Sequence, residues 1–459
     1  MSKKSKTVFI CQECGYESPK WQGQCICGQW NTMVEEKVVE IREDDKRHRG
    51  ASGEKLKANR LSDIKSGSET RIDTGIGELN RVLGGGLVVG SLTLISGEPG
   101  IGKSTIIIQA ASKIAERCGK VLYVTGEESA EQVKMRADRV CKGSLDDLFL
   151  LSETNMEHIV KIAEELNPAF LIIDSIQTMY TDALESAPGS VSQVRACGNE
   201  LMRIGKGKKI PIFIVAHVTK SGDLAGPKII EHLVDCVLNF TGERDQDLRI
   251  LRAYKNRFGT TSEIGAFEMA EEGLTEIHNL SECFLEGMEE GTEGAVATAL
   301  YEGTRPLLLE VQALTSPTNI GFARRTAIGV ELSRLNMILA VLERKANLSL
   351  INQDVYVNIV GGMRPEGTSI DLAVALAIYS SCKRMKGLNR VLAIGEIGLT
   401  GDLRSIRNAD KIVREAARLG FRTVIMPQKN AAKLAEMPGG LKVVGVNSLN
   451  EAIQTASQT

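Results

Sequence analysis

Residues 97–104 form a glycine-rich stretch of the kind that binds phosphate groups. They read Gly-Glu-Pro-Gly-Ile-Gly-Lys-Ser and match the pattern G-x-x-x-x-G-K-[ST] at every fixed position. The apolar run 92–95 before them predicts a buried strand, and residues 105–115 after them predict a helix. Glycines let backbone N–H groups surround an anion, and a helix N-terminus adds a positive dipole end. The stretch therefore predicts a nucleotide-binding loop, and its flanks disfavour the alternative of a chance glycine-rich turn.

The side chains of this loop have separate expected roles. Lys103 is expected to reach the β- and γ-phosphates, where it would be catalytic, and the Ser104 hydroxyl is expected to hold Mg²⁺. The expected cofactors of this site are ATP and Mg²⁺. The expected nucleotide-binding residues are Gly97, Glu98, Pro99, Gly100, Ile101, Gly102, Lys103, Ser104 and Thr105.

Residues 61–275 alternate apolar runs with amphipathic segments, which predicts an α/β fold with a mostly parallel sheet covered by helices. One run, 170–173, ends in Asp174. A carboxylate at the end of a buried strand beside a phosphate loop is placed to hold the water shell of Mg²⁺. The expected strands are 92–96, 121–125, 148–151, 170–173, 212–216, 236–240 and 249–254.

Two carboxylates follow the expected strand 121–125. Glu127 and Glu128 lie where an attacking water would be polarised, and we expect Glu127 to be the general base, with Glu128 as the alternative. Ser129 is also a suitable N-cap for a helix over 130–140, and the alternative interpretation is that Glu128 and Ser129 only begin that helix. Both interpretations are compatible.

Two more groups follow strands of the same domain. His217 comes after strand 211–216 and is a candidate γ-phosphate sensor, with Lys220 in a loop that could move with nucleotide state; a purely structural histidine is the alternative. Residues 255–259 read Lys-Asn-Arg-Phe-Gly and place two cations and an aromatic ring on a short loop. This loop would reach a neighbouring subunit's nucleotide or contact DNA, unless it is a solvated turn.

Four of the ten cysteines lie within residues 8–34. Cys11 and Cys14 form a C-x-x-C pair, and Cys25 and Cys27 form a tighter C-x-C pair. Two close pairs separated by a short loop are typical of a small module that gathers four thiolates around Zn²⁺. We therefore expect structural zinc, and the alternative is a metal-free, redox-sensitive segment.

The composition limits the function classes. A chain of 459 residues suggests two or three domains, and the net charge of −2 means that any DNA site must be a local patch. The sequence shows neither a signal peptide nor an apolar run long enough to span a bilayer. We therefore expect a cytoplasmic protein with no membrane partner.

These motifs together resemble the RadA (Sms) family of bacterial DNA-repair proteins. The phosphate loop, Gly-Glu-Glu-Ser at 126–129, the run ending at Asp174, Ala-His-Val-Thr-Lys at 216–220 and the 255–259 pentapeptide stand in the family's order, and the resemblance covers nearly the whole chain. It implies a zinc finger, a RecA-like ATPase and a Lon-protease-like domain. It also implies a homo-hexameric, ATP-driven motor that moves branches in recombination intermediates, with single-stranded and branched DNA and a recombinase as partners.

The resemblance also implies roles for individual residues. The residues implied to couple ATP to DNA are Lys255, Asn256, Arg257, Phe258 and Gly259, and Arg257 is implied to act across the subunit interface. One departure concerns zinc, because the family's second cysteine pair is usually C-x-x-C and here it is Cys25-Ile26-Cys27.

Changes in composition suggest the domain boundaries. The expected parts are a zinc module over 1–34, a flexible linker over 35–60, the ATPase domain over 61–275, a linker over 276–292 and a Lon-protease-like domain over 293–459. In the last domain we expect strands 297–301, 307–314, 355–360, 391–394 and 423–426, with helices 329–345, 370–381 and 408–419.

The Lon resemblance raises an alternative function, that of an ATP-dependent serine protease. Such proteolysis requires a serine beside a lysine of depressed pKa. Ser369 lies close to where the Lon serine would fall, but Asp410 occupies the lysine position and Lys411 follows one residue later. Since one residue is about a 100° turn of a helix, Lys411 should point elsewhere. We therefore expect a ring-forming platform that holds DNA.

DNA contacts are the least determined part of the sequence. Phosphate binding requires only cations aimed at one groove, and each cation alone is more often a solvated charge. The candidates are Lys220, Arg324, Arg325, Lys345 and Arg364. A weaker third possibility for the whole chain is a RecA-like switch of the clock-protein kind, which would read nucleotide state without DNA.

Overall fold

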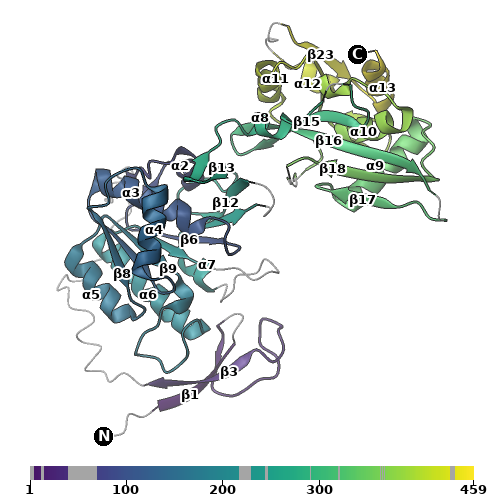
Figure 1. Cartoon of the computed structure of the whole chain (residues 1–459). Coiled ribbons are helices and arrows are strands. Elements are labelled where there is room, and N and C mark those ends of the chain that lie inside the picture. Colours follow the sequence, from purple (N-terminus) through teal and green to yellow (C-terminus); the bar gives the residue numbers. More distant parts are fainter. Residues whose placement is uncertain are drawn as a thin grey trace, which may run out of the picture. The chain divides into compact units, whose positions relative to one another are not determined.

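The chain divides into two units, residues 1–277 and 278–459, which are described separately here (Figure 1). The computed structural model describes residues 5–11, 15–39, 70–216, 229–242, 247–289, 291–318, 321–361, 363, 365, 367–434 and 440–458. Most of the expected linker over 35–60 therefore lies outside the described residues. No helix in the described ranges has the length and apolar character that crossing a membrane requires.

The first element group is a small antiparallel sheet in the order β2-β1-β3. Its strands are β1 (Ser5–Cys11), β2 (Glu17–Ser18) and β3 (Met33–Val39). Cys11 pairs with Met33 across β1 and β3, and both are buried together with Cys25. A core of this size is too small to stabilise a module, which agrees with a need for metal.

Nine strands form one sheet in the described part of the first unit. Six neighbours from β11 to β8 run parallel, and β12, β13 and β14 continue the sheet antiparallel. The order across the sheet is β14 (Gly273–Glu276), β13 (Ile264–Ala270), β12 (Leu248–Asn256), β11 (Cys236–Thr241), β6 (Leu92–Gly97), β10 (Ile212–Val215), β9 (Phe170–Asp174), β7 (Val121–Thr125) and β8 (Leu148–Ser152).

Helices cover both faces of this sheet (Figure 1). One apolar core takes residues from α2 (Gly77–Leu83), α3 (Lys103–Cys118) and α4 (Ala130–Val140). The other takes residues from α5 (Met156–Leu166), α6 (Val191–Lys208) and α7 (Ile229–Leu233). The central strands are buried along their whole length, which explains why their sequences are continuous apolar runs.

The parallel strands of this sheet and β12 lie where the sequence predicts strands, whereas β13 and β14 were not predicted. All seven expected strands are present, with ends that shift by one or two residues. The two strands of this sheet that were not expected are β13 and β14. A short antiparallel pair, β4 (Arg71–Ile72) with β5 (Leu87–Val88), flanks α2 in the chain and was not expected either.

The second unit is built on a mixed sheet, with helices from α8 to α13. The order is β17 (Arg325–Ile328), β18 (Gln353–Ile359), β16 (Arg305–Pro317), β15 (Ala295–Glu302), β19 (Val391–Ala393), β22 (Thr423–Pro427) and β23 (Lys442–Val446). The helices are α8 (Leu280–Leu285), α9 (Leu332–Lys345), α10 (Asp371–Lys383), α11 (Ala409–Arg418), α12 (Gln428–Ala431) and α13 (Leu449–Ser457).

Helix α8 lies within the range 276–292 that the sequence suggested as a linker. Its buried Ser281 hydroxyl accepts a hydrogen bond of 3.1 Å from the backbone N–H of Leu308 on β16. The buried Leu280 and Phe284 lie on the same helix. Part of this range is therefore folded onto the second unit, since a short helix holds apolar side chains out of water only by packing.

Candidate nucleotide site

The phosphate loop follows β6 and leads into α3, the order that the motif requires. Two of its glycines have backbone angles that favour glycine, with φ of 151° at Gly97 and 112° at Gly102. A Cβ at Gly97 would also lie 2.8 Å from the carbonyl oxygen of Phe240 on β11. Gly102 is the N-cap of α3, so the loop presents backbone N–H groups at a helix start.

Lys103 is folded back onto this loop. Only 4% of its surface is exposed, and its Nζ donates to the carbonyl oxygens of Gly97 at 2.7 Å and Glu98 at 2.9 Å. Burial lowers the pKa of Lys103 to about 8, although the carboxylates of Asp174 and Glu127 act in the opposite direction. A bound polyphosphate would place further negative charge next to this buried ammonium group.

Asp174 ends β9 and meets two hydroxyl groups. The Ser104 hydroxyl donates to its Oδ2 at 2.8 Å, and the hydroxyl of Tyr123 on β7 donates to the same oxygen. Burial raises the pKa of the Asp174 carboxyl, and these two hydrogen bonds act against the rise. Octahedral Mg²⁺ with Mg–O distances of ~2.1 Å places neighbouring oxygens about 3 Å apart, so the spacing of the Ser104 and Asp174 oxygens fits that ion.

The two glutamates after β7 have different partners. The Ser175 hydroxyl, which follows Asp174 in the chain, donates to Glu127. Glu128 instead forms an ion pair with Arg136 on α4. Helix α4 is held at its start by a capping box between Ser129 and Gln132.

These groups share one pocket of about 450 Å³. The expected site residues that line it are Pro99, Gly100, Gly102, Lys103, Ser104, Thr105, Glu127 and Asp174. Gly97, Glu98 and Ile101 are not in the lining, and two of them serve as carbonyl acceptors for Lys103. Glu128, the alternative general base, lines the pocket too, and the lining residues that were not expected are Thr125, Arg136, Arg139, Arg249 and Met269.

The sequence held a signal for two of the missed residues. Arg136 and Arg139 are three residues apart on the helix that directly follows the glutamates, so they project from one face of α4. Tyr123 gave no such signal, because a tyrosine in an apolar run is usually only part of the core.

Residues 255–259 are tied to their own subunit, and the expected loop is shorter than predicted because Lys255 and Asn256 lie on β12. Lys255 donates to the carbonyl oxygen of Glu231, at 2.7 Å, and to that of His232, at 3.4 Å, near the end of α7. Arg257 forms a 3.0 Å ion pair with the buried Asp235, which lies between α7 and β11. Burial, with a contribution from the neighbouring Arg257, lowers the pKa of Lys255.

Two further hydrogen bonds fix residues 255–259 to α2 and to β4. Asn256 donates to the carbonyl oxygen of Val82 at 3.2 Å, and Arg71 donates to the carbonyl oxygen of Phe258 at 2.7 Å. None of residues 255–259 is in the lining of the nucleotide pocket. Any contact of this loop with a nucleotide would therefore be made with another subunit's site.

Three of the four expected zinc ligands come together in the N-terminal module. The Sγ atoms of Cys11, Cys25 and Cys27 lie within 4.8 Å of one another, with 3.9 Å between Cys11 and Cys27. Tetrahedral Zn²⁺ with Zn–S bonds of ~2.3 Å separates its thiolates by about 3.8 Å, so the donor set fits the ion. Cys14 lies outside the described residues. The C-x-C spacing therefore does not prevent Cys27 from joining the cluster.

Of the remaining candidates, the structure describes Arg324, Arg325 and Lys345. His217, Lys220 and Arg364 lie outside the described residues. The Arg325 guanidinium donates to the backbone carbonyl oxygen of Leu350, at 2.8 Å, and to that of Gln353. These hydrogen bonds connect β17 to the start of β18. Arg324 and Lys345 are exposed side chains of the second unit.

A phosphate loop, a strand-end carboxylate and a pair of glutamates at the carboxyl ends of parallel strands define a RecA-like P-loop ATPase. Family models agree with this class: residues 58–223 match an AAA domain, and residues 9–35 match a rubredoxin metal binding domain. Residues 320–430 match subunit ChlI of Mg-chelatase, and none of these matching models carries the name Lon. The Lon likeness of the second unit therefore stays a prediction.

Curated relatives identify the family. The DNA repair protein RadA of Bacillus subtilis (strain 168) is 49% identical over 455 residues, covering 99% of both chains. The protein of that name from Listeria monocytogenes is 47% identical over 457 residues, covering 99% of this chain and 98% of its own. The chain belongs to the RadA family of DNA repair proteins. A solved KaiC-like protein from Pyrococcus horikoshii matches 46% of this chain at 18% identity, with a TM-score of 0.39.

Proposed function

We propose that this chain is a DNA-dependent ATPase motor of the helicase type that promotes branch migration in recombinational DNA repair. The observation that carries the proposal is the pocket that gathers Lys103, Glu127 and Asp174 in a chain of the RadA family. The proposed DNA partners are single-stranded and branched DNA, the proposed protein partner is a recombinase, and the proposed assembly is a homo-hexamer.

The nucleotide would be held mainly by the phosphate loop. Its N–H groups and Lys103 would bind the β- and γ-phosphates, and Ser104 and Asp174 would hold Mg²⁺, which supplies charge neutralisation at the phosphates. Lys103 would exchange its two backbone carbonyl partners for phosphate oxygens, which are stronger acceptors for an ammonium group.

Glu127 is the proposed general base. The Ser175 hydroxyl orients its carboxylate, and Glu127 would accept the proton from the water that attacks the γ-phosphate. Glu128 is less suited to this role, because its carboxylate is already paired with Arg136. Arg257 of one subunit would act at the nucleotide of the next, which would link hydrolysis to DNA movement.

A matched pair of substitutions tests the base. Glu127→Gln should slow ATP hydrolysis by about 10²–10⁴-fold, the usual contribution of a general base, while nucleotide affinity stays near the parental value. Glu131→Gln is the control, because Glu131 is an exposed residue of α4 outside the pocket lining. Hydrolysis at the parental rate by Glu127→Gln would remove Glu127 from this role.

We propose that the second unit is not a protease. Lys411, the lysine closest to the Lon position, is exposed, and its Nζ donates to the Tyr301 hydroxyl at 2.6 Å. That hydrogen bond raises the pKa of Lys411, whereas a catalytic lysine needs a depressed pKa. Asp410, at the expected lysine position, is also exposed. A casein-type unfolded substrate should therefore stay intact during ATP hydrolysis.

A further inference from the structure

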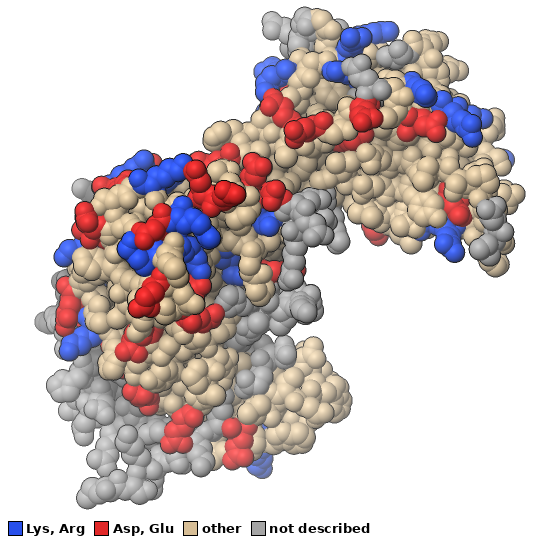
Figure 2. Space-filling model, in the orientation of Figure 1, with Lys and Arg blue, Asp and Glu red and all other residues tan. Residues whose placement is uncertain are grey.

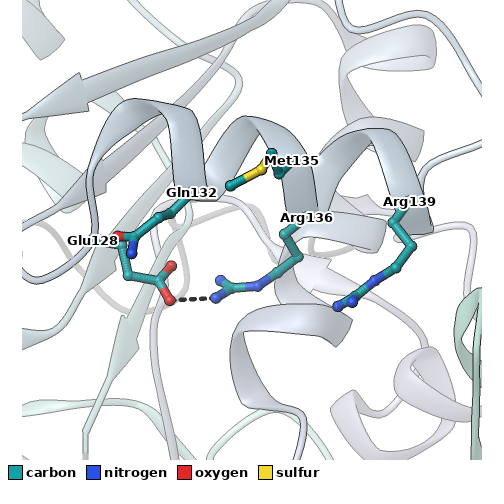
Figure 3. Close-up of a pocket in the computed structure, with 5 residues that line it drawn as sticks. All are labelled: Glu128, Gln132, Met135, Arg136 and Arg139. Atoms are coloured by element: carbon teal, nitrogen blue, oxygen red, sulfur yellow. Dashed lines mark hydrogen bonds and ion pairs between the residues drawn. The ribbon is translucent and has the colours of Figure 1, made fainter.

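Two arginines of α4 line the nucleotide pocket together with its expected ligands. Arg136 and Arg139 are one helical turn apart, and their side chains extend in the same direction (Figure 3). Both line the pocket that contains Lys103 and Asp174. Both also line an adjoining hollow of about 380 Å³, shared with Glu128.

Arg136 is only partly satisfied by its present partner. One terminal nitrogen, Nη2, pairs with a carboxylate oxygen of Glu128 (Figure 3). The other, Nη1, is buried and has no hydrogen-bond partner among the described residues. A guanidinium presents its donors in a flat fork, so it can hold a carboxylate with one nitrogen and a phosphate oxygen with the other.

Arg139 is the more accessible of the two. It is an exposed residue of α4, and no ion pair of the described residues includes it. Its i, i+3 spacing from Arg136 places it on the same face of a helix that the capping box holds in position. Helix α4 therefore need not move for both cations to reach the pocket, and only the side chain of Arg136 has to turn to present its buried Nη1.

The charges in the pocket favour an anion. Three carboxylates line it, from Glu127, Glu128 and Asp174. Four cationic side chains line it as well, which are Lys103, Arg136, Arg139 and Arg249. Figure 2 shows Lys and Arg side chains gathered among acidic ones on the face of the first unit that carries α4. A bound Mg²⁺ would further raise the positive charge that the polyphosphate balances.

We propose that Arg136 and Arg139 form a subsite for the terminal phosphate of a nucleoside triphosphate, bound in the same subunit as the phosphate loop. Arg136 bridges Glu128 to that phosphate through its second nitrogen, and Arg139 supplies a further cation at the rim. This inference rests on the proposed nucleotide site and adds to it the means of distinguishing a triphosphate from a diphosphate. It also explains why Glu128 is held away from the role of base.

The test compares the affinities of the full chain for ATPγS and ADP by calorimetry. Arg139→Ala should weaken ATPγS binding by about ten- to a hundredfold, the effect of losing one charge-assisted hydrogen bond, and should leave ADP binding within about threefold. Arg136→Lys should do the same, because a lysine keeps the charge but has no second nitrogen to bridge with. Arg117→Ala is the matched control, since Arg117 pairs with Asp73 outside the pocket lining.

The outcomes separate this inference from the proposed function. If both arginine variants keep the parental ratio of ATPγS to ADP affinity, the subsite does not exist, even though the nucleotide site stands. If Lys103→Ala also leaves both affinities unchanged, the nucleotide site itself is wrongly assigned. Arg139→Ala carries the test if Arg136→Lys does not fold, because Arg139 is exposed and makes no ion pair among the described residues.

Discussion

Among single residues, the buried Lys103 links nucleotide binding to pH. Its pKa of about 8 in the free protein means that the ammonium form is lost as the pH rises above 8. A bound phosphate favours that charged form, so binding takes up a proton in this range. ATP affinity should therefore be constant between pH 6.5 and 7.5 and should fall by about tenfold at pH 9.

Calorimetry across this pH range checks the lysine directly. Lys103→Arg is the control, because an arginine stays charged throughout and its affinity should not change with pH in this way. An equal loss of affinity for both proteins would mean that another group titrates. The account would also be contradicted by a parental affinity that rises above pH 8.

Tyr123 is proposed as a positioning residue for Asp174. Its hydroxyl is one of two that donate to the same carboxylate oxygen, and both hydrogen bonds lower a carboxyl pKa that burial raises. Tyr123→Phe should therefore raise the pKa of Asp174. The acidic limb of the pH profile of ATP hydrolysis should move to higher pH, because the ionised carboxylate is required.

A pH profile separates this role from simple packing. Phenylalanine keeps the buried ring, so a variant with a lower rate at every pH and an unmoved acidic limb would show only a structural effect. Tyr254→Phe serves as the control, because Tyr254 is an exposed residue of β12, with 66% of its surface accessible. Its profile should match that of the parental protein.

At the scale of secondary-structure elements, the 255–259 loop and α7 should act as one unit. Lys255 donates to a carbonyl oxygen of α7, and Arg257 pairs with Asp235 in the segment that joins α7 to β11. Arg257→Ala should leave ATP binding unchanged and should abolish most of the acceleration of hydrolysis by single-stranded DNA. Because Arg257 is half exposed whereas Asp235 is buried, the loss of this ion pair should lower the free energy of unfolding by about 1–3 kcal/mol.

Two measurements on this variant check the coupling role. ATP affinity should stay close to the parental value, whereas branch migration on a four-way junction should be lost. If Arg257→Ala migrates branches at the parental rate, the loop does not couple ATP to DNA. Lys142→Ala is the control, because its ion pair with Glu272 is exposed.

The N-terminal module should depend on metal as a separate element. We expect one zinc per chain in the parental protein and none in Cys27→Ser, because a structural site does not hold the ion with three thiolates at comparable affinity. ATP binding should be unaffected, because these cysteines lie in a different sheet from the phosphate loop. Elemental analysis that finds no zinc in the parental protein would overturn the assignment.

The elements show how far the sequence could predict the structure. Continuous apolar runs bounded by glycine-rich segments were enough to locate the parallel strands, because these strands are buried on both faces. The strands β13 and β14 were missed because each is buried at its start and more exposed at its end, so neither shows a continuous apolar run or a strict alternation. Helix α8 lay in a stretch that composition alone suggested was a linker, and only its packing against β16 shows its place.

The nucleotide site was predictable where it is local and unpredictable where it depends on neighbouring strands. The phosphate loop is contiguous in the sequence, so its residues could be named together. The hydrogen bond from Tyr123 to Asp174 requires β7 and β9 to be neighbours. The sequence of neither strand predicts that order across the sheet. The two arginines of α4 had a visible spacing but needed the structure to show which way they face.

At the scale of the whole molecule, the chain joins a metal-binding ribbon, a RecA-like ATPase and a second α/β unit of mixed sheet. The formal charge of −2 excludes DNA attraction by bulk charge, so a ring would have to concentrate cations by symmetry. DNA binding of this kind releases counterions from the phosphates and should weaken steeply as salt increases.

The most direct test is the rate of ATP hydrolysis by the purified full chain, with and without single-stranded DNA, over a series of salt concentrations. The account predicts a rate that DNA raises severalfold, an effect that fades between about 50 and 200 mM salt, and no activity in Lys103→Ala. A rate that is indifferent to DNA at every salt concentration, or that an unfolded protein raises instead, would contradict the motor.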